Sequence, residues 1–472
     1  MIRMERLFDV LRKPGAKPEI QGTAPTQSPG VESSPQTTGY APKNKARLLD
    51  RWLDYIVRAS GSGPIFFLIL AGLLAWALLG IKYGSNDDWQ VLISDIQAII
   101  SYVFDSFLMR QQLNAYEEEM VVTAELQSRI LSHSRMLTQL RLTMDQQDKQ
   151  CNGAVKEQRT DFAVELPTET RFGRSITRIS HVFGHMGTIC LFWGGVFAWI
   201  GIGHRYNYSD QWQLYMNSAS SALMVFLFAF LANIRERHAA YTRSCLDAIF
   251  HVDSALERKL RLLTGDTLAN SAVTIPAPKV NKIQRAIFYY ADLVGTLVGI
   301  TILLAVLVIW VGIGPLLHFQ SNWWLLIGTY AGLVGMNDSF VLRNLQARLG
   351  SYVDAEFTQI GTSDAKLFPD APPTQEIVAP NSRASDVMNR ICAHEFTVVV
   401  GVVTILGLLA GASALRWTLT GQLLCNVPPS VIESFLMLVL VTGHNSADDR
   451  KRVDLRNTYA RRLSLLGFVN AI

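Results

Sequence analysis

Long apolar stretches constrain this chain more than any other feature of its sequence. Residues 292–313 read DLVGTLVGITILLAVLVIWVGI, and residues 64–81 read PIFFLILAGLLAWALLGI. As helices, both are long enough to cross a hydrocarbon core of about 30 Å. Of the 472 residues, 49% are hydrophobic and only 17% are charged, whereas ordinary globular domains contain about 25% charged residues. We therefore expect an integral membrane protein that has the lipid bilayer as a partner.

Eight apolar segments are predicted to be transmembrane helices, and they fall into four pairs. A short connection joins the two members of each pair, and long polar segments separate the pairs. Lys and Arg gather in the long segments, so the positive-inside rule places these segments and both termini in the cytosol. The predicted pairs are 64–82 with 89–110, 185–203 with 212–233, 292–313 with 323–342, and 396–415 with 429–445.

The second helices of the four pairs can be aligned with one another. Trp89, Trp212 and Trp323 fall in register at the outer end, and Leu424 takes this position in the fourth copy. Because each unit has two spans, all four units share one orientation. We expect an all-α integral membrane protein with about eight transmembrane helices in four parallel two-helix repeats, carrying cytosolic helical extensions.

The polar segments divide the chain further. The first 45 residues are rich in Pro, Gly, Ser, Thr and Gln, a composition that buries too little apolar surface to order itself. After each second helix, apolar residues recur at spacings of three and four, which predicts an amphipathic stalk that braces the bundle or binds partners, including a second copy of the chain. The expected order is a disordered cytosolic tail (1–45), hairpin repeat 1 (46–110), a cytosolic helical linker (111–180), repeat 2 (181–233), a second helical linker (234–288), repeat 3 (289–342), a third linker (343–393), repeat 4 (394–446) and a cytosolic tail (447–472).

Four acidic residues lie inside the predicted spans. Counted from the aligned tryptophan position, Asp95 and Glu433 form an outer layer six to nine residues in, and Asp105 and Asp338 form a deeper layer. At about 1.5 Å per residue, the layers lie roughly 9–14 Å and 21–24 Å below the outer interface. Intramembrane carboxylates usually face a partner or a water-filled path, and they mark ion pathways.

Carboxylate, amide and hydroxyl oxygens suit a hard or borderline divalent cation. We therefore predict a transport path that includes the four acids and Asn337. Weak binding at several successive sites is what conduction requires. The alternative for each acid is an interhelical hydrogen bond or a carboxyl group kept protonated by burial.

Signals for other chemistry are absent from the sequence. It has no Walker A loop, no HExxH, no GxSxG and no dinucleotide fingerprint, which argues against an ATP-driven pump and most membrane hydrolases. Five cysteines are scattered singly, so neither a zinc ribbon nor a disulfide framework is indicated. We expect no enzymatic activity, no cofactor and no nucleic-acid partner.

One segment resembles the signature of a known family. Residues 209–250, SDQWQLYMNSASSALMVFLFAFLANIRERHAAYTRSCLDAIF, are similar to that of the low-affinity iron permeases, in which a D-x-W-Q-L-x-x-N helix precedes a Phe/Leu run and a cytosolic helix. The resemblance implies a plasma-membrane permease for Fe(II), and less selectively for Zn(II) or Cu(II), and it adds Asn217 to the path. The matching residues are Asp210, Trp212, Gln213, Leu214, Asn217, Leu246 and Asp247, with Asp88, Trp89 and Gln90 in the first repeat.

The leading hypothesis is low-affinity transmembrane transport of divalent metal cations. Two alternatives from other classes remain open at this stage. One is a non-transporting membrane scaffold or sensor with partner-binding cytosolic helices, which the divergence of the third and fourth repeats favours. The other is a monovalent ion channel.

Overall fold

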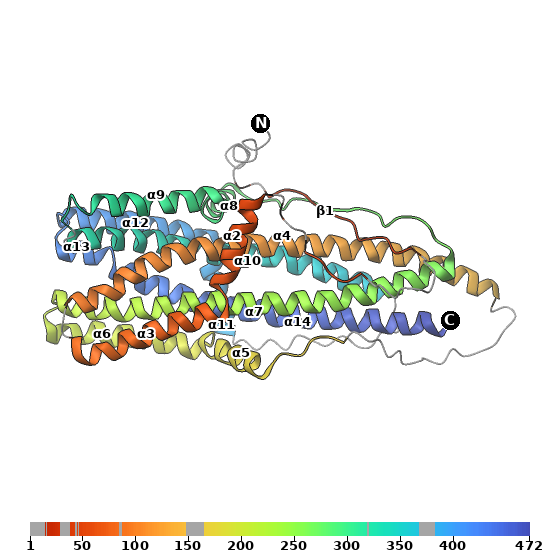
Figure 1. Cartoon of the computed structure of the whole chain (residues 1–472), viewed down its shortest axis with the longest axis horizontal. Helices are drawn as coiled ribbons and strands as arrows, with labels where there is room; N and C mark the ends of the chain where they lie inside the picture. Colours follow the sequence, from red (N-terminus) through yellow and green to blue (C-terminus); the bar gives the residue numbers. More distant parts are fainter. Residues whose placement is uncertain are drawn as a thin grey trace, which may run out of the picture.

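One order of elements recurs four times along the chain. In the computed structural model, a short helix is followed by an apolar helix and then by a very long helix (Figure 1). We call each such set a trio. The structure describes residues 15, 17–28, 38–42, 45, 47–84, 87–147, 165–318, 321–367 and 383–472. Most of the predicted tail, parts of the linkers 111–180 and 343–393, and the side chain of Asp88 lie outside the described residues.

The fourth trio differs from the other three by one additional short helix before its long helix. The first trio is α2 (Leu48–Ser60), α3 (Gly63–Tyr83) and α4 (Asp87–Gln147). The second is α5 (Arg171–Phe183), α6 (Met186–Gly203) with the 3₁₀ turn η1 (His204–Tyr206), and α7 (Asp210–Thr264). The third is α8 (Lys282–Gly295), α9 (Leu297–Ile313) and α10 (Ser321–Leu367), and the fourth is α11 (Arg383–Ala393), α12 (Glu395–Ala414), α13 (Leu419–Leu424) and α14 (Val427–Ala471).

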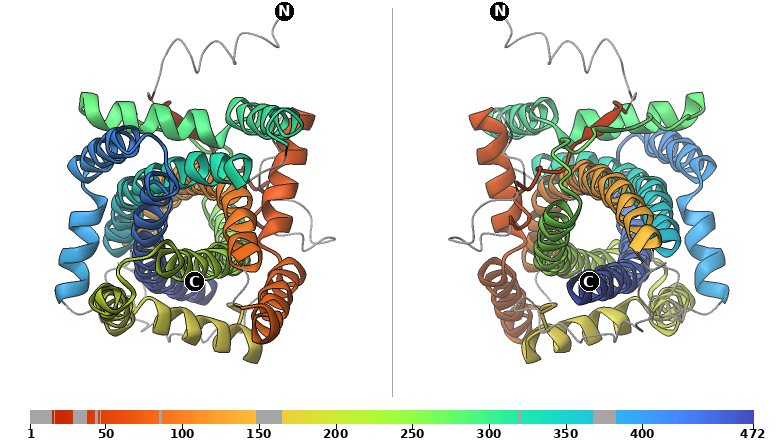
Figure 2. Two further views of the ribbon diagram at one scale, coloured as in Figure 1. Left: turned by 90° about the vertical axis from the view of Figure 1, so that its left-hand side faces the viewer. Right: turned by 90° about the vertical axis from the view of Figure 1, so that its right-hand side faces the viewer.

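The four long helices form an inner bundle. They contact one another in the order α4, α7, α14, α10 and back to α4, so α4 lies diagonally opposite α14, and α7 opposite α10. Figure 2 shows this square seen end-on, with the four short helices lying crosswise around it. The apolar helices cover only one half of the bundle, and the long helices continue beyond them as a stalk that ends at the C-terminus (Figure 1). We use the word stalk for residues 111–147, 234–264, 345–367 and 446–471.

The number of clear membrane spans is smaller than the sequence predicts. Among the described residues, six helices are long and apolar enough to cross a membrane. A seventh is obtained if α8 and α9, which meet at an angle of 63°, are counted together. The helix α10, which contains the predicted span 323–342, is not among the six. The chain is therefore an all-α membrane protein with six or seven apolar candidate spans.

Each short helix meets its apolar helix at a junction that we call an elbow. At each elbow, a side chain on the long helix of a neighbouring trio donates a hydrogen bond to a backbone carbonyl group near the end of the short helix. Three of these hydrogen bonds are short, and the fourth is longer and therefore weaker. All four donors lie 21 residues after the aligned Trp or Leu424 position. The bonds are Asn233 Nδ2 to Gly61 O (2.9 Å), Asn445 Nδ2 to Ser180 O (2.8 Å), Asn344 Nδ2 to Ala393 O (2.7 Å) and Arg110 Nη1 to Gly295 O (3.3 Å).

Stacked tryptophans join the apolar helix to the long helix in three trios. The ring centroids are 4.4 Å apart in Trp76–Trp89, 3.8 Å in Trp199–Trp212 and 4.2 Å in Trp310–Trp323, and the ring planes are almost parallel. Offset or parallel ring contacts of this kind add to the free energy gained from burial. The predicted register of the three aligned tryptophans is confirmed by this shared pairing.

Part of the predicted disordered tail is ordered against the stalk. Strand β1 (Ile20–Gly22) pairs antiparallel with β2 (Val273–Ile275). At Gly22 an added Cβ would lie 2.7 Å from the Cβ of Ala124, so the strand lies directly on α4. The prediction of disorder is wrong for this part, because it considered only the apolar surface of the tail itself and not the surface that the stalk supplies.

The predicted amphipathic faces of the stalk helices are buried against one another within a single chain. Leu126, Ile249, Leu349 and Leu465, one from each long helix, are almost completely shielded from solvent. The stalk interior also encloses charged side chains. Among them, three arginines and three acids form one network of ion pairs, namely Arg129, Arg261, Arg462, Asp253, Glu257 and Asp364.

Candidate cation path in the inner bundle

Three buried carboxylates from three long helices form the most unusual polar group in the membrane half. Asp105 on α4, Asp338 on α10 and Glu433 on α14 have exposed fractions of 0%, 1% and 0%. The charges of Glu433 and Asp338 both act on Asp105. Because α4 and α14 are diagonal neighbours, Asp105 and Glu433 can influence each other only across the middle of the bundle. We call these three residues the carboxylate cluster.

The carboxylate cluster lacks the partners that buried carboxylates normally have. Neither oxygen of Asp105 or of Glu433 has a hydrogen-bond partner among the described residues. Asp338 Oδ1 accepts a hydrogen bond of 2.6 Å from the Tyr290 hydroxyl, and its Oδ2 has no such partner. Within the described chain, none of the salt bridges reaches these three acids. A buried carboxylate in this situation is either protonated or accompanied by a cation from outside the chain.

A glycine makes room for one member of the carboxylate cluster. At Gly335 on α10, an added Cβ would lie 2.7 Å from Glu433 Oε1, which is closer than real Cβ atoms approach. Gly335 precedes Asp338 by three residues, so both lie on neighbouring parts of the α10 surface. The absence of a side chain at position 335 therefore allows the Glu433 carboxyl group to approach α10 near Asp338.

The grouping of the four acids differs from the prediction. Asp105 and Asp338 lie close together, as expected for the deeper layer, but Glu433 joins them rather than Asp95. Asp95 is buried, with an exposed fraction of 8%, and no ionisable side chain of the described residues is close enough for its charge to act on it. The pairing of Asp95 with Glu433 is wrong because residue counting places Cα atoms, whereas the long Glu433 side chain reaches Gly335.

Amides and hydroxyls line the helix contacts on the outer side of the carboxylate cluster. Asn217 Nδ2 on α7 donates a hydrogen bond of 2.8 Å to Ser94 Oγ on α4. The hydroxyls of Ser220 on α7 and Ser430 on α14 are 2.8 Å apart. Gln97 Nε2 donates to Ser101 Oγ, also on α4, at 3.1 Å, and Ser221 Oγ on α7 donates to Gln97 Oε1 at 3.3 Å. The outer part of the inner bundle is therefore joined by neutral polar groups.

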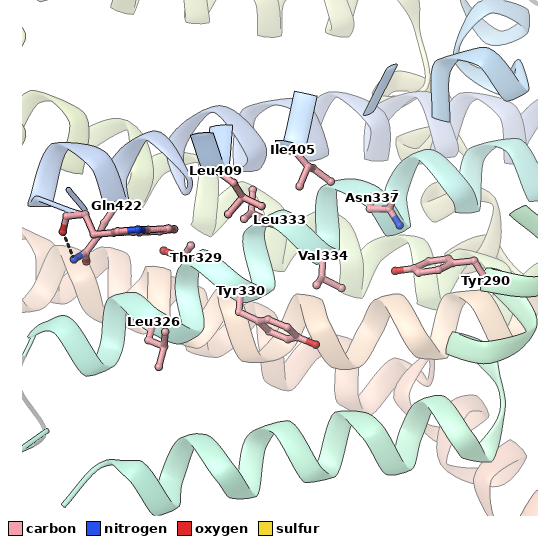
Figure 3. A pocket seen from close by; sticks show the side chains of 11 residues that line it. Tyr290, Leu326, Thr329, Tyr330, Leu333, Val334, Asn337, Ile405, Leu409 and Gln422 are labelled. Atoms are coloured by element: carbon pink, nitrogen blue, oxygen red, sulfur yellow. Dashed lines mark hydrogen bonds between the residues drawn. The ribbon is translucent and has the colours of Figure 1, made fainter. Parts of the chain in front are cut away.

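Asn337 lies in a different environment from the carboxylate cluster. It lines a pocket of about 610 Å³ between α10 and α12, together with Tyr290 at the same end (Figure 3). Tyr290 connects the two environments, because its hydroxyl donates to Asp338 and also contacts Asn337. No sequence pattern points to Tyr290, since it belongs to the short helix α8 and lies 48 positions away from Asp338.

The donor groups of the path are not gathered into a closed metal site. In the part of the chain that the structure describes, no three His, Cys, Asp or Glu side chains are placed so that they could hold one metal ion. Each position along the inner bundle thus provides few protein ligands. A cation there would keep several water molecules, which is a condition for weak binding and rapid release.

A helical bundle with six or seven apolar candidate spans defines the broad class of this chain as a multi-pass integral membrane protein, and buried carboxylates without partners are typical of members with an ion pathway. The model of the low-affinity iron permease family matches residues 172–275 and 381–465. The chain belongs to this low-affinity iron permease family, as its similarity to two curated relatives shows.

Two curated relatives are similar over most of their length. The low-affinity iron/zinc ion transport protein fet4 of Schizosaccharomyces pombe is 38% identical over 423 residues, which cover 88% of this chain and 72% of the relative. The low-affinity Fe(2+) transport protein of Saccharomyces cerevisiae is 35% identical over 459 residues, which cover 89% of this chain and 83% of the relative. No solved structure matches the chain.

Proposed function

We propose that this chain is a low-affinity permease for divalent metal cations, with Fe(II) as the main substrate and Zn(II) or Cu(II) as less favoured ones. The observation that carries the proposal is the carboxylate cluster, whose buried acids have no cationic partner within the described chain. The two relatives support the choice of metal, because one is named as an iron/zinc transporter and the other as an Fe(2+) transporter.

The proposed path runs along the inner bundle. A cation enters past Asp95 and Asn217 and then reaches Glu433, Asp105 and Asp338, with Asn337 acting on Asp338 through Tyr290. Successive carboxylates, amides and water suit Fe(II) because it is a borderline cation that accepts oxygen ligands. Several weak sites also explain low affinity, since a deep single site would slow release.

The proposed topology has eight spans in four parallel two-helix repeats, with the stalk and both termini in the cytosol of a cell whose plasma membrane holds the protein. The recurrence of the trio supports this proposal, as do the three equivalent tryptophan pairs and the four elbow hydrogen bonds. The crosswise short helices fit the membrane surface, since α2 exposes Leu48, Trp52 and Tyr55 while burying Leu53 and Val57.

Uptake of radioactive Fe(II) by cells that lack their own iron transport tests the proposal. We expect Glu433→Gln, Asp105→Asn and Asp338→Asn each to lower uptake on the order of tenfold, which corresponds to about 1.4 kcal/mol. Asp95→Asn should have a smaller effect, because Asp95 has no charged neighbour among the described residues. The matched control is Glu356→Gln in the stalk of α10, whose side chain accepts a 2.8 Å hydrogen bond from Gln127. Unchanged uptake for all four membrane variants, at normal surface amounts, would refute the assignment.

The two alternatives make different predictions. A monovalent channel would carry current in the absence of divalent metals, so conductance measurements distinguish it. The scaffold hypothesis needs apolar stalk faces that are free to bind partners, but those faces are buried within the chain. Any homo-oligomer would for the same reason use other surfaces than these faces of the cytosolic helices.

A further inference from the structure

The fourth trio departs from the other three at the end where the apolar helices turn into the long helices. The first three trios each stack two indole rings there. In the fourth trio Leu424 takes the aligned position, and Trp417, which follows α12, lines the pocket beside α10 instead. Only this trio, in the part of the chain that the structure describes, carries the additional short helix α13. The exception to the repeat therefore coincides with a pocket.

This pocket has the size of a small-molecule site and the length of one membrane leaflet. Its volume of about 610 Å³ lies within the range of roughly 300–1,000 Å³ that is usual for ligand pockets. It follows α10 from Leu326 to Asn337, as Figure 3 shows. At about 1.5 Å per residue this stretch is roughly 16 Å long, which is about half of a hydrocarbon core of about 30 Å. An occupant of the whole pocket would therefore span about one leaflet.

The walls of the pocket are apolar and carry no charge. Leu333 and Val334 of α10 face Ile405 and Leu409 of α12 in its middle part (Figure 3). None of the described residues that line it is charged. The pocket lies in the half of the bundle that the apolar helices cover, so hydrocarbon is its surrounding solvent. A lipid of the bilayer is therefore the molecule that has access to it, and the lining offers no cation to a phosphate group.

One end of the pocket presents a hydrogen-bond acceptor without a donor. Gln422 on α13 lines the pocket, and its Nε2 donates a hydrogen bond of 2.9 Å to the backbone oxygen of Trp417. Its Oε1 is buried and has no hydrogen-bond partner in the described chain. A buried acceptor without a partner calls for an explanation, because most such atoms are paired in folded proteins. A ligand with a hydroxyl group at this end would supply the missing donor.

Further along the pocket, hydroxyl groups of the lining are already engaged. Tyr330 and Tyr102 of α4 have their hydroxyl oxygens 3.1 Å apart. At the opposite end, the Tyr290 hydroxyl donates to Asp338 Oδ1 at 2.6 Å. The pocket therefore has an open acceptor near one interface and an apolar body that extends toward the middle of the membrane.

We propose that this pocket is a binding site for a membrane sterol. A sterol has one hydroxyl group at the end of a rigid apolar body, and the hydroxyl donates to Gln422 Oε1 while the body lies along α10. A rigid ligand loses little conformational freedom when it enters a preformed pocket. The far end of the sterol rests near Tyr290, so the bound lipid reaches a residue that holds Asp338 of the carboxylate cluster.

Binding of tritiated cholesterol to the purified full-length protein in detergent tests the site. We expect saturable binding to the wild type and an affinity about fivefold lower for Gln422→Leu, because one hydrogen bond is lost. Cholesteryl methyl ether cannot donate a hydrogen bond, so the wild type should prefer cholesterol to this ether about fivefold. Gln422→Leu should show no such preference. This comparison of two ligands isolates the hydrogen bond from any general change in the protein.

A larger side chain inside the pocket provides the second variant. Leu409→Trp fills the space and should abolish saturable binding. Its matched control is Leu406→Trp on the same helix α12, where the side chain is 61% exposed and does not line the pocket. Only variants that elute as the wild type does and melt cooperatively are compared, and the ether comparison on the wild type carries the test if Leu409→Trp does not fold.

Three results would overturn the proposal. The first is the absence of saturable cholesterol binding to the wild type. The second is an equal loss of binding in Leu406→Trp and Leu409→Trp. The third is displacement of cholesterol by dioleoylphosphatidylcholine as effectively as by unlabelled cholesterol, which would assign the pocket to phospholipid chains. All binding is measured without divalent metals, so its outcome is independent of the proposed transport.

Discussion

The same four long helices bury charge in two regions, and they treat it in opposite ways. In the stalk, every acid of the buried group has an arginine beside it. In the membrane half, the carboxylate cluster has none among the described residues. The stalk pairs are Arg129–Glu257 at 3.1 Å, Arg261–Glu257 at 2.9 Å, Arg462–Asp253 at 3.1 Å and Arg462–Asp364 at 2.8 Å.

This difference separates a structural use of charge from a functional one. Three cations and three anions make the stalk network neutral, so the chain itself completes it. A buried pair of this kind adds little net stability, but the loss of one partner is strongly destabilising. The carboxylate cluster, in contrast, has no such partner within the described chain, and in the proposed function a cation from solution supplies it.

The largest effect is expected from breaking the stalk network. Arg462→Met leaves Asp253 and Asp364 buried without their shared cation, and we expect a loss of about 3–5 kcal/mol in the free energy of unfolding. The melting temperature in detergent measures this loss. The control is Arg450→Met, which removes a solvent-exposed pair with Asp354 at 3.3 Å and should change stability by less than about 1 kcal/mol. Equal losses of stability in both variants would show that the buried network contributes no more to the free energy of unfolding than an exposed ion pair does.

The next prediction concerns the space beside two glycines of α10, one in the membrane half and one in the stalk. Gly335→Ala should push the Glu433 carboxyl group aside, at a cost of about 1–3 kcal/mol, and should lower Fe(II) uptake. Gly350→Ala lies in the stalk of the same helix with open space around it, and it should stabilise the protein by up to about 1 kcal/mol. Melting temperature and uptake are measured for both variants. If Gly335→Ala behaves as Gly350→Ala does, the close approach of Glu433 to α10 is not required.

A third prediction compares charge removal in the membrane half. Glu433→Gln keeps the shape of the side chain and removes a charge that lacks a partner, so stability should stay within about 1 kcal/mol of the wild type or rise. The same melting measurement applies, and uptake should fall as stated above. A drop in melting temperature as large as that of Arg462→Met would mean that the membrane acid, too, is balanced within the chain.

The smallest effect is a pH dependence located in the stalk. Burial lowers the pKa of His133 well below its usual range, and the guanidinium group of Arg462 lowers this pKa further. The unfolded chain takes up a proton near pH 6.5 that the folded chain does not bind. The contribution of His133 to the free energy of unfolding is therefore complete above about pH 6.5. It falls as the pH decreases, by at most about 1.4 kcal/mol per pH unit. The free energy of unfolding is measured between pH 6.5 and 5. His133→Gln should reduce its dependence on pH in this range, and an unchanged dependence would mean that other groups cause it.

Much of the architecture could be predicted from the sequence, because it depends on local periodicity. The aligned tryptophans gave the correct register of three long helices, and Asp105 and Asp338 were placed at one depth. The order of the long helices around the bundle could not be predicted, since each presents apolar and polar faces of similar kind. The contact of Tyr290 with Asp338 and the reach of Glu433 to Gly335 depend on side-chain directions, which spacing along one helix does not determine.

The order of helices around the inner bundle has a consequence for biogenesis. The second and third long helices, α7 and α10, are consecutive in synthesis but diagonal in space; α4 lies between them on one side, and α14 fills the position between them on the other side. During translation the bundle thus remains open on one side until the last trio has left the ribosome. Until then, the seams of α7 and α10 that bear serines, amides and Asp338 face lipid or a chaperone. A chain cut short before α14 would therefore expose polar surface inside the bilayer, which is the kind of defect that membrane quality control removes.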